Sequence, residues 1–369
     1  MKPEILIIAD CDPRKLVIGG VGVYSYNLAR YLIKKNFKVI FIGKKQKGKI
    51  INFFDMEFIE LNKESNQSNY IFLKNLFKIA RTIKLNKNIT IHSQRPDWLV
   101  PFSKFKNGKI VTLHGSHSKN VYLKKGFIIG KIYSKLEEKG LQIADAIISV
   151  SEENTKYYKN SYKDHPVMTE KFVTIPVGVD LSKFKGINKD KAKKKYGFKK
   201  SDKAVIYVGR FEKEKNLKLL IKACQEANVK LFLVGSGKEE EEIKKFAYKI
   251  NSNIRFHKPI SNFEVPNILA SCDVLALTSL HEGFPTVVIE ALAAGIPVIS
   301  TNVGDINKLV IGGKTGFIIN GNNLVNKLKI LIRDSSKYRS NCIKKAQEYS
   351  WDKIGSKILH TYYKLTKFS

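Results

Sequence analysis

Short apolar runs alternate with amphipathic stretches from the start of the chain. An apolar run at Ile5–Ala9 is followed by a glycine-rich turn at Gly19–Gly22. A helical pattern then extends from Val23 to Leu32, and a second apolar run covers Val39–Ile42. This order predicts the beginning of a doubly wound parallel sheet. Further predicted strands lie at Ile89–His92, Ile110–Leu113 and Ala146–Val150, and predicted helices at Phe72–Ile83 and Ile128–Leu141.

The same alternation begins again at Ala204, which predicts a second α/β domain. Its predicted strands are Val205–Val208, Leu231–Val234, Val274–Leu277 and Val298–Ile299, and its predicted helices are Leu217–Ala227, Glu239–Ile250 and Val287–Ala294. We expect domains at residues 1–176 and 177–350, joined where Pro176 and Gly178 precede a lysine-dense stretch. A helical pattern from Trp351 to Leu365 predicts that residues 351–369 pack back on the first domain.

Composition agrees with two soluble domains. The chain has 369 residues, 43% of them hydrophobic and 27% charged, which excludes disordered and fibrous classes. The four cysteines form no C-x-x-C pair, so neither a structural zinc site nor a disulfide scaffold is expected. The sequence shows no signal-peptide pattern and no apolar stretch long enough to span a bilayer, which favours a cytoplasmic protein.

The net charge is +33, from 66 Lys and Arg against 33 Asp and Glu, and both halves share the excess. Such a charge has several explanations. It could reflect a lysine-rich composition without functional meaning, or binding to an anionic substrate, an anionic membrane surface or nucleic acid.

A loop before a predicted helix carries the first candidate chemistry. The sequence His281–Thr286 follows an apolar strand, and Pro285 stands where a helix would begin. The backbone N–H groups and dipole of a helix N-terminus suit a phosphate. Glu282 alone could be a solvated loop acid, but Glu290 interrupts an apolar helix face, where acids seldom lie without a partner.

A second loop follows the first strand of the second domain. In the stretch Gly209–Asn216, Arg210 can fork onto a phosphate and Lys215 can add a point charge. Doubly wound sheets bind ligands at the carboxyl ends of their strands. The loop alone is one basic segment among many, but together with the Glu282 loop it predicts a phosphate-containing ligand.

These segments resemble the retaining glycosyltransferases of family 4. Glu282 and Glu290 match the family's E-x7-E signature, and Gly209–Arg210 with Lys215 match its diphosphate-binding loop. Further similarity lies at Gly19–Gly20, residues 28–32, Ile175–Phe184, Gly313–Ile319 and the helix from Trp351. The resemblance covers nearly the whole chain and is most specific in the second domain.

The resemblance implies an α/β fold of the GT-B type, with two Rossmann-like domains facing each other across a cleft. It implies that the second domain holds a nucleotide-diphosphate sugar, of the UDP or GDP type, and the first domain the acceptor. Arg210 and Lys215 would neutralise the diphosphate, Glu282 would hold the donor sugar and Glu290 the ribose. The donor-binding residues so implied are Gly20, Gly22, Arg210, Lys215, Glu282, Gly283, Phe284, Pro285, Thr286, Val287 and Glu290. No metal and no cofactor are expected, because Arg, Lys and a helix terminus offset the leaving-group charge.

His114 completes the implied catalytic set with Glu282, Arg210 and Lys215. It follows the predicted strand Ile110–Leu113, and a histidine at this kind of position faces the reacting sugar in the family. His117 and His92 are competing candidates. Two departures from the family pattern are Val177 in place of the usual Asn and Lys308 in place of an acid, and the second leaves the donor sugar open.

The leading interpretation is therefore a metal-independent retaining glycosyltransferase that moves a sugar to a hydroxyl of a glycan or lipid-linked acceptor by front-face attack. A sugar phosphorylase or nucleotide-sugar hydrolase of the same fold is the alternative. A basic nucleic-acid-binding protein is a third interpretation, which the clustered Arg210, Lys215, Glu282 and Glu290 argue against.

A lysine-rich block predicts where the acceptor is met. Residues 98–136 contain no acidic residue and eight lysines, interleaved with aromatic and aliphatic side chains. We expect this block to contact an anionic membrane peripherally, on its cytoplasmic face. The competing interpretation is a solvated rim on a lysine-rich protein.

Overall fold

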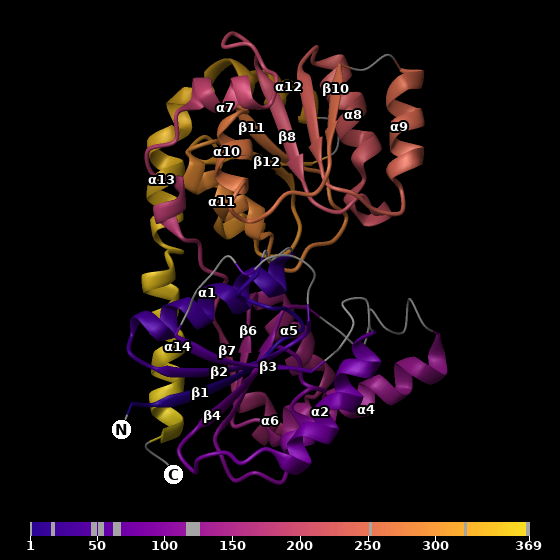
Figure 1. The fold of residues 1–369 in the computed structure, drawn as a ribbon. Helices are drawn as coiled ribbons and strands as arrows, with labels where there is room; N and C mark the ends of the chain where they lie inside the picture. Colours follow the sequence, from indigo (N-terminus) through magenta and orange to yellow (C-terminus); the bar gives the residue numbers. More distant parts are fainter. Residues whose placement is uncertain are drawn as a thin grey trace. The chain divides into compact units, whose positions relative to one another are not determined.

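The chain divides into two structural units, each described by itself. The computed structural model describes residues 2–15, 19–45, 50, 55–61, 68–115, 126–250, 253–320 and 323–366. Residues 1–177 and 351–369 belong to the first unit, and residues 178–350 to the second (Figure 1).

The first unit contains a seven-stranded sheet of order β3-β2-β1-β4-β5-β6-β7, in which every pair is parallel. Its strands are β1 (Glu4–Ile8), β2 (Lys38–Gly43), β3 (Met56–Glu60), β4 (Thr90–Ser93), β5 (Lys109–Leu113), β6 (Ala146–Ser149) and β7 (Phe172–Thr174). The five predicted strands are confirmed. Because the chain order reverses between β1 and β4, the ends of these two strands form a topological switch point, where such sheets bind ligands.

Helices join these strands and cover the sheet. They are α1 (Gly20–Lys34), α2 (Asn69–Thr82), α4 (Phe127–Ile143), α5 (Glu152–Ser161), α6 (Pro166–Glu170) and α14 (Trp351–Thr366), with a short 3-10 helix η1 (Val100–Phe102). Their apolar sides form a core with the sheet, in which Trp98, Phe72 and Phe102 are fully buried.

The last helix packs on α1. A Cβ atom at Gly355 would lie only 2.4 Å from the ring of Tyr31, so the two helices approach closely there. The ring of Trp351 lies 5.5 Å from that of Tyr24. Burial of these aromatic rings explains why a helix at the end of the sequence belongs to the first unit.

The second unit repeats the architecture with six parallel strands in the order β10-β9-β8-β11-β12-β13. The strands are β8 (Ala204–Val208), β9 (Lys230–Val234), β10 (Ile254–His257), β11 (Val274–Leu277), β12 (Val298–Thr301) and β13 (Gly316–Ile319). The four predicted strands are confirmed. The switch point lies between β8 and β11, whose strand-end loops carry the two predicted phosphate-binding segments.

The helices of this unit are mostly short. They are α7 (Lys189–Lys195), α8 (Leu217–Glu226), α9 (Glu240–Lys249), α10 (Val265–Ala270), α11 (Thr286–Ala294), α12 (Leu324–Asp334) and α13 (Arg339–Gln347). Four 3-10 helices accompany them in the described ranges: η2 (Leu181–Phe184), η3 (Lys213–Lys215), η4 (Ile306–Lys308) and η6 (Ser335–Tyr338).

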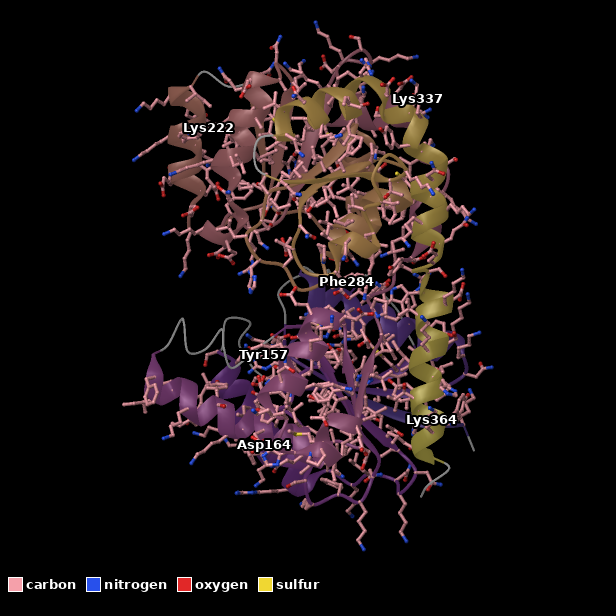
Figure 2. The ribbon with its side chains drawn as sticks, turned by 180° about the vertical axis from the view of Figure 1, so that it is seen from behind. Tyr157, Asp164, Lys222, Phe284, Lys337 and Lys364 are labelled. Carbon is pink, nitrogen blue, oxygen red and sulfur yellow. The ribbon has the colours of Figure 1, made fainter. Side chains whose placement is uncertain are left out.

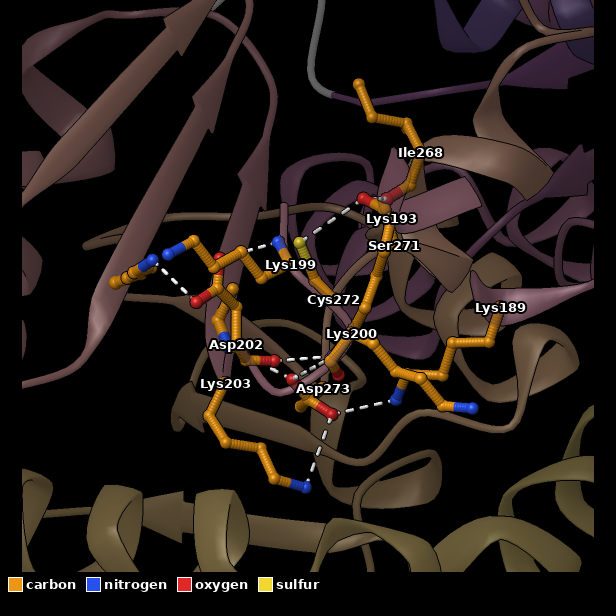
Figure 3. A network of polar contacts seen from close by, with 12 residues as sticks. Lys189, Lys193, Lys199, Lys200, Asp202, Lys203, Ile268, Ser271, Cys272 and Asp273 are labelled. Atoms are coloured by element: carbon orange, nitrogen blue, oxygen red, sulfur yellow. Dashed lines mark hydrogen bonds and ion pairs between the residues drawn. The ribbon is translucent and has the colours of Figure 1, made fainter. Parts of the chain in front are cut away.

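A buried carboxylate ties α7 to the amino end of the second sheet (Figure 3). Asp273 directly precedes β11, and its oxygens accept hydrogen bonds from Lys189 Nζ at 2.7 Å and from the backbone N–H of Ala204 at 3.0 Å. Lys203 Nζ lies 3.8 Å from the same carboxylate. A buried carboxylate is stable only when it is paired. Part of the lysine excess is therefore structural. It lies at the amino-terminal ends of the strands, opposite the carboxyl ends that carry the predicted site.

Candidate functional site

The two predicted phosphate-binding loops of the second unit are hydrogen-bonded to each other. The loop after β8 ends in η3, and the loop after β11 runs from Thr278 to Pro285. The backbone N–H of Leu280 donates to the carbonyl of Glu214 at 2.7 Å. The hydroxyl of Thr278 lies 3.1 Å from the carbonyl oxygens of both Lys215 and Asn216. The switch point therefore carries one connected loop structure.

Lys215 and Glu282 form the centre of this structure. Lys215 Nζ donates to Glu282 Oε1 at 2.7 Å, and the hydroxyl of Ser279 donates to the same oxygen at 2.7 Å. Both charged side chains are mostly buried, so water screens the pair little. The contact leaves Glu282 Oε2 and the remaining ammonium hydrogens of Lys215 for a ligand.

Arg210 stands at the rim of the same loops. Its side chain is 62% exposed, and its guanidinium nitrogens lie 3.7 Å and 3.8 Å from carboxylate oxygens of Glu212 and Glu214. Its carbonyl accepts a hydrogen bond from the hydroxyl of Tyr207 at 2.9 Å, which holds the backbone in place while the side chain extends into solvent. Exposed pairs of this kind contribute little to stability. Arg210 is therefore available to a phosphate.

The helix α11 begins beside the acidic loop, with Pro285 at its N-cap and no side-chain cap. The ring of Phe284, labelled in Figure 2, lies 6.1 Å from that of Tyr349. Gly304, in the loop after β12, closes over this turn with a φ of +56°. A Cβ atom there would lie 2.4 Å from the carbonyl oxygen of Gly283. Only glycine fits this approach, which holds the start of α11 in place.

Glu290 lies one turn into α11 and is half-buried. Burial raises the pKa of its carboxyl from 4.5 to about 7, and the nearby positive charge of Lys183 on η2 opposes that rise. A carboxyl in this state gains from a ligand that donates hydrogen bonds to it.

In the first unit, His114 meets polar groups from neighbouring strand ends. His114 follows β5, and its Nε2 donates to Oε1 of Gln94, which follows β4, at 2.9 Å. The ring of Tyr24 packs edge-on against the His114 ring at 4.8 Å. Burial lowers the pKa of His114 to about 4, so its ring is neutral at physiological pH. With Nε2 protonated, Nδ1 is the hydrogen-bond acceptor of the ring.

His114 and Gln94 line a cavity of about 260 Å³ at the switch point of the first sheet. Asp10, Val21 and Gln94 contribute to its wall together with His114. The Nε2 of Gln94 is buried and has no hydrogen-bond partner in the described residues. A buried amide without a partner is costly, so this donor suits a ligand hydroxyl. The sequence did not predict Gln94; its position directly after a strand was the available signal.

The two competing histidines differ. His92 is fully buried, with Nδ1 2.5 Å from the hydroxyl of Tyr362 on α14 and Nε2 2.7 Å from Thr112 Oγ1. Both of its ring nitrogens are occupied, so His92 is structural. His117 lies outside the described residues.

The predicted glycine loop of the first unit leads into α1. Gly19 is the N-cap with a φ of 90°, the helix begins at Gly20, and Gly22 is buried in its first turn. Among the residues that the structure describes, no atom outside the helix's own backbone lies within 4 Å of a Cβ built at Gly20, so these residues leave space for a ligand there.

One pair of closely spaced acidic residues was not among the predicted site residues. Asp10–Cys11–Asp12 has the D-x-D spacing found at many metal sites. Asp12 is fully buried, and its two oxygens accept from Arg14 Nε at 2.9 Å and from Arg14 Nη2 at 3.0 Å. This bidentate pair occupies the Asp12 carboxylate. Within the residues that the structure describes, no three His, Cys, Asp or Glu side chains are grouped as a metal site.

Two family models match the chain. The model described as Glycosyltransferase Family 4 matches residues 18–183, and the model described as Glycosyl transferases group 1 matches residues 188–349. The chain belongs to the family 4 glycosyltransferases. The resemblance expected from the motifs is thereby confirmed, and this glycosyltransferase is an enzyme of the sugar-transferring class.

Relatives cover most of this glycosyltransferase. It is 27% identical over 364 residues, or 95% of each chain, to an uncharacterized glycosyltransferase of Methanocaldococcus jannaschii. It is 28% identical over 275 residues to an Escherichia coli UDP-Gal:alpha-D-GlcNAc-diphosphoundecaprenol alpha-1,3-galactosyltransferase, covering 71% of this chain and 70% of the relative.

The fold is also shared with solved structures. Sucrose-phosphate synthase from Thermosynechococcus elongatus matches with a TM-score of 0.84 and 22% identity, over 100% of each chain. The two parallel sheets and this match show the α/β GT-B fold that the motifs predicted. Among the described helices, none is long and apolar enough to cross a membrane.

Proposed function

We propose that this glycosyltransferase takes a sugar from a nucleotide-diphosphate donor held by the second unit. The observation that carries the proposal is the mostly buried Lys215–Glu282 contact at 2.7 Å, beside the uncapped start of α11. A cation, a carboxylate and a helix N-terminus at one switch point suit a diphosphate with an attached sugar. The donor named for the Escherichia coli relative, UDP-Gal, belongs to this chemical class.

Each side chain has a role in this proposal. Lys215 and Arg210 pair with the diphosphate, and the backbone N–H groups of Phe284, Thr286 and Val287 contact it at the start of α11. Glu282, held by Lys215 and Ser279, accepts hydrogen bonds from sugar hydroxyls through its other oxygen. Glu290 accepts hydrogen bonds from the ribose hydroxyls. Because ribose hydroxyls are donors, their binding stabilises the charged carboxylate and lowers the pKa of Glu290.

The transfer proceeds with the anomeric configuration retained. The bond between the anomeric carbon and the diphosphate oxygen breaks, and the acceptor oxygen forms its bond on the same face. The departing phosphate oxygen takes the acceptor's proton, so the chain supplies no nucleophile. Lys215 and Arg210 stabilise the negative charge that develops on the leaving diphosphate, and electrostatic stabilisation of this kind is a large catalytic term.

His114 and Gln94 serve the substrate on the first unit. The unpartnered Nε2 of Gln94 donates to a sugar or acceptor hydroxyl, and the neutral His114 ring remains able to accept one. We propose a glycan or lipid-linked acceptor, the second being the kind named for the Escherichia coli relative. A phosphorylase or hydrolase would use the same diphosphate-binding residues, but no observation favours either over transfer to an acceptor hydroxyl.

Donor binding is tested with a matched pair of lysine variants. A screen of nucleotide sugars by thermal shift should find a donor, because a ligand at 100 times its Kd stabilises the folded state by about 2.7 kcal/mol. Lys215→Gln should weaken that donor about 100-fold, since hydrogen bonds to charged groups contribute about 1.5–3 kcal/mol. Lys213→Gln removes an equal charge from an exposed side chain of the same η3 and should leave the affinity unchanged. Equal losses in both variants, or binding of DNA in place of any nucleotide sugar, would contradict the proposal.

A further inference from the structure

The outer side of α4 carries large apolar side chains in solvent. Phe127 is 71% exposed, Ile128 75% and Ile132 56%. The positions that α4 buries are instead Gly130, Glu137, Gly140 and Leu141. Surface helices normally turn their apolar residues inward. The first two turns of α4 therefore do the opposite, and contiguous exposed apolar residues mark interaction surfaces.

The helix α2 presents a second row of the same character. Tyr70 is 65% exposed and Phe77 41%, at a spacing that places both on one side of the helix. Lys74, Lys78 and Arg81 are exposed along the same side. Aromatic rings and cations thus alternate on the outer side of α2, while its buried residues pack into the core of the first unit.

The two helices lie side by side on one flank of the first unit (Figure 1). The electrostatic influence of Tyr70 on α2 upon Tyr133 on α4 shows the same proximity. We call the exposed residues of α2 and of the first nine residues of α4 the α2–α4 face. Lys131 and Lys135 are its cations on α4.

The α2–α4 face carries charge of one sign. Neither α2 nor residues 127–135 contain an acidic residue. Elsewhere the structure mixes signs on exposed helices; α9, for example, begins with three consecutive glutamates. The apolar side chains of this surface are unfavourable in water, and its cations would be unfavourable against a neutral apolar partner.

We propose that the α2–α4 face binds the surface of an anionic lipid bilayer. Apolar side chains such as Ile128 and Phe127 enter the boundary between headgroups and acyl chains, while Lys131 and Lys135 extend their ammonium groups to the lipid phosphates. Aromatic side chains such as Tyr70 settle at the same depth. Each lysine contributes about 1 kcal/mol at such a surface, or a factor of about five in affinity.

This face overlaps only in part with the block of residues 98–136 that the sequence predicted. Within residues 98–136, Trp98 and Phe102 are fully buried. Lys109 is also buried and donates from Nζ to the carbonyl oxygens of Phe105 and Asn107. Lys119, Lys124 and Lys125 lie outside the described residues. The proposed contact therefore rests on α4 and on α2, which the sequence pattern did not include.

Vesicle co-sedimentation tests the charge part of the proposal. The protein should bind vesicles of phosphatidylglycerol mixed with phosphatidylcholine, and binding should fall as salt increases. The double variant Lys131→Gln and Lys135→Gln should bind about 30-fold more weakly. The matched control, Lys245→Gln with Lys249→Gln, removes two exposed charges from α9 of the second unit and should stay within about threefold of the wild type. An equal loss in both double variants would overturn the proposal.

A second pair of variants tests the apolar part. Ile128→Ser with Ile132→Ser should weaken vesicle binding at least about tenfold, because the lost apolar area no longer leaves water. Tyr248→Ser, at a residue of α9 that is 76% exposed, should change nothing. Equal binding to vesicles of phosphatidylcholine alone would overturn the proposal. The proposal would also be overturned if the protein formed a dimer without lipid and the Ile128→Ser with Ile132→Ser variant were monomeric. No sugar is present, so the outcome is independent of the donor-binding test.

Discussion

At the residue scale, Arg210 and Glu282 serve one proposed ligand but differ in what they contribute to the fold. Arg210 is mostly exposed and makes ion pairs of 3.7 and 3.8 Å, whereas Glu282 accepts two hydrogen bonds of 2.7 Å. Arg210→Ala should therefore reduce transfer about 100-fold through the lost charge contact without changing the melting temperature. Glu282→Ala should reduce transfer similarly and also lower the melting temperature, because Lys215 loses its buried partner. Calorimetry beside steady-state kinetics separates the two; near-normal turnover in Arg210→Ala would remove it from the diphosphate site.

Glu290 gives the fold a pH dependence of known sign. Its pKa rises from 4.5 to about 7 on folding, so the folded protein binds this proton more tightly than the unfolded chain. The corresponding stability is fully present below about pH 4.5 and is lost as the pH rises through about 7. Glu290→Gln keeps the shape and removes the titration. The melting temperature of Glu290→Gln minus that of the wild type should therefore be larger at about pH 8 than at about pH 5. A difference that is the same at both pH values would show that Glu290 does not titrate in this range.

At the element scale, the loop after β12 supports the start of α11 through one glycine. In Gly304→Ala, the new Cβ would meet the carbonyl oxygen of Gly283 at 2.4 Å, and the positive φ adds strain. The loop must shift, so the variant should bind the nucleotide sugar at least about tenfold more weakly and lose about 1–3 kcal/mol of stability. Gly312→Ala is the matched control, since within the described part of the chain no atom beyond its two neighbours lies within 4 Å of a Cβ built there. Unchanged donor affinity in Gly304→Ala would mean that α11 holds its position without this loop.

The same scale shows which elements the sequence could predict. Central strands such as β5 and β11 are buried throughout, so apolar residues dominate β5 and make up the whole of β11. The edge strand β3 was missed because it is only partly covered and includes two glutamates. The three-residue β7 is too short for any periodicity. The hydrophobic pattern of a sequence reflects which positions are buried. An element that is covered on just one side therefore has a weaker pattern.

The candidate site divides in a similar way. The loops with Arg210, Lys215 and Glu282 could be predicted because they combine a strand-end position with a family motif. Gln94 could not, because a single amide after a strand forms no motif, and its buried unpartnered nitrogen is a property of the fold. The D-x-D spacing of Asp10 and Asp12 was overlooked in the sequence, and the spacing alone would not have shown that Arg14 already occupies the Asp12 carboxylate.

At the scale of the whole molecule, the net charge of +33 has several separate uses. Lysines such as Lys222, Lys337 and Lys364 project from the surface (Figure 2). Lys189, by contrast, compensates the buried Asp273, and Lys215 pairs with Glu282. The lysines of the α2–α4 face form a third group, distinguished by their apolar neighbours. The net charge alone cannot distinguish these groups, because they differ in how deeply each lysine is buried and in which partner its ammonium group has.

The reaction as a whole should proceed without a divalent cation and with the donor's anomeric configuration kept. Arg210, Lys215 and the start of α11 supply positive charge where the diphosphate leaves, and front-face attack needs no nucleophile from the chain. We therefore expect activity to be unchanged after treatment with a strong chelator. Proton NMR of the fresh product should show the same anomeric form as the donor sugar. Adding back Mg²⁺ or Mn²⁺ is the control, because a stimulated rate would place a metal ion at the diphosphate. An inverted product would instead require a general base opposite the leaving group, a role for which the neutral His114 ring would then be the first residue to test.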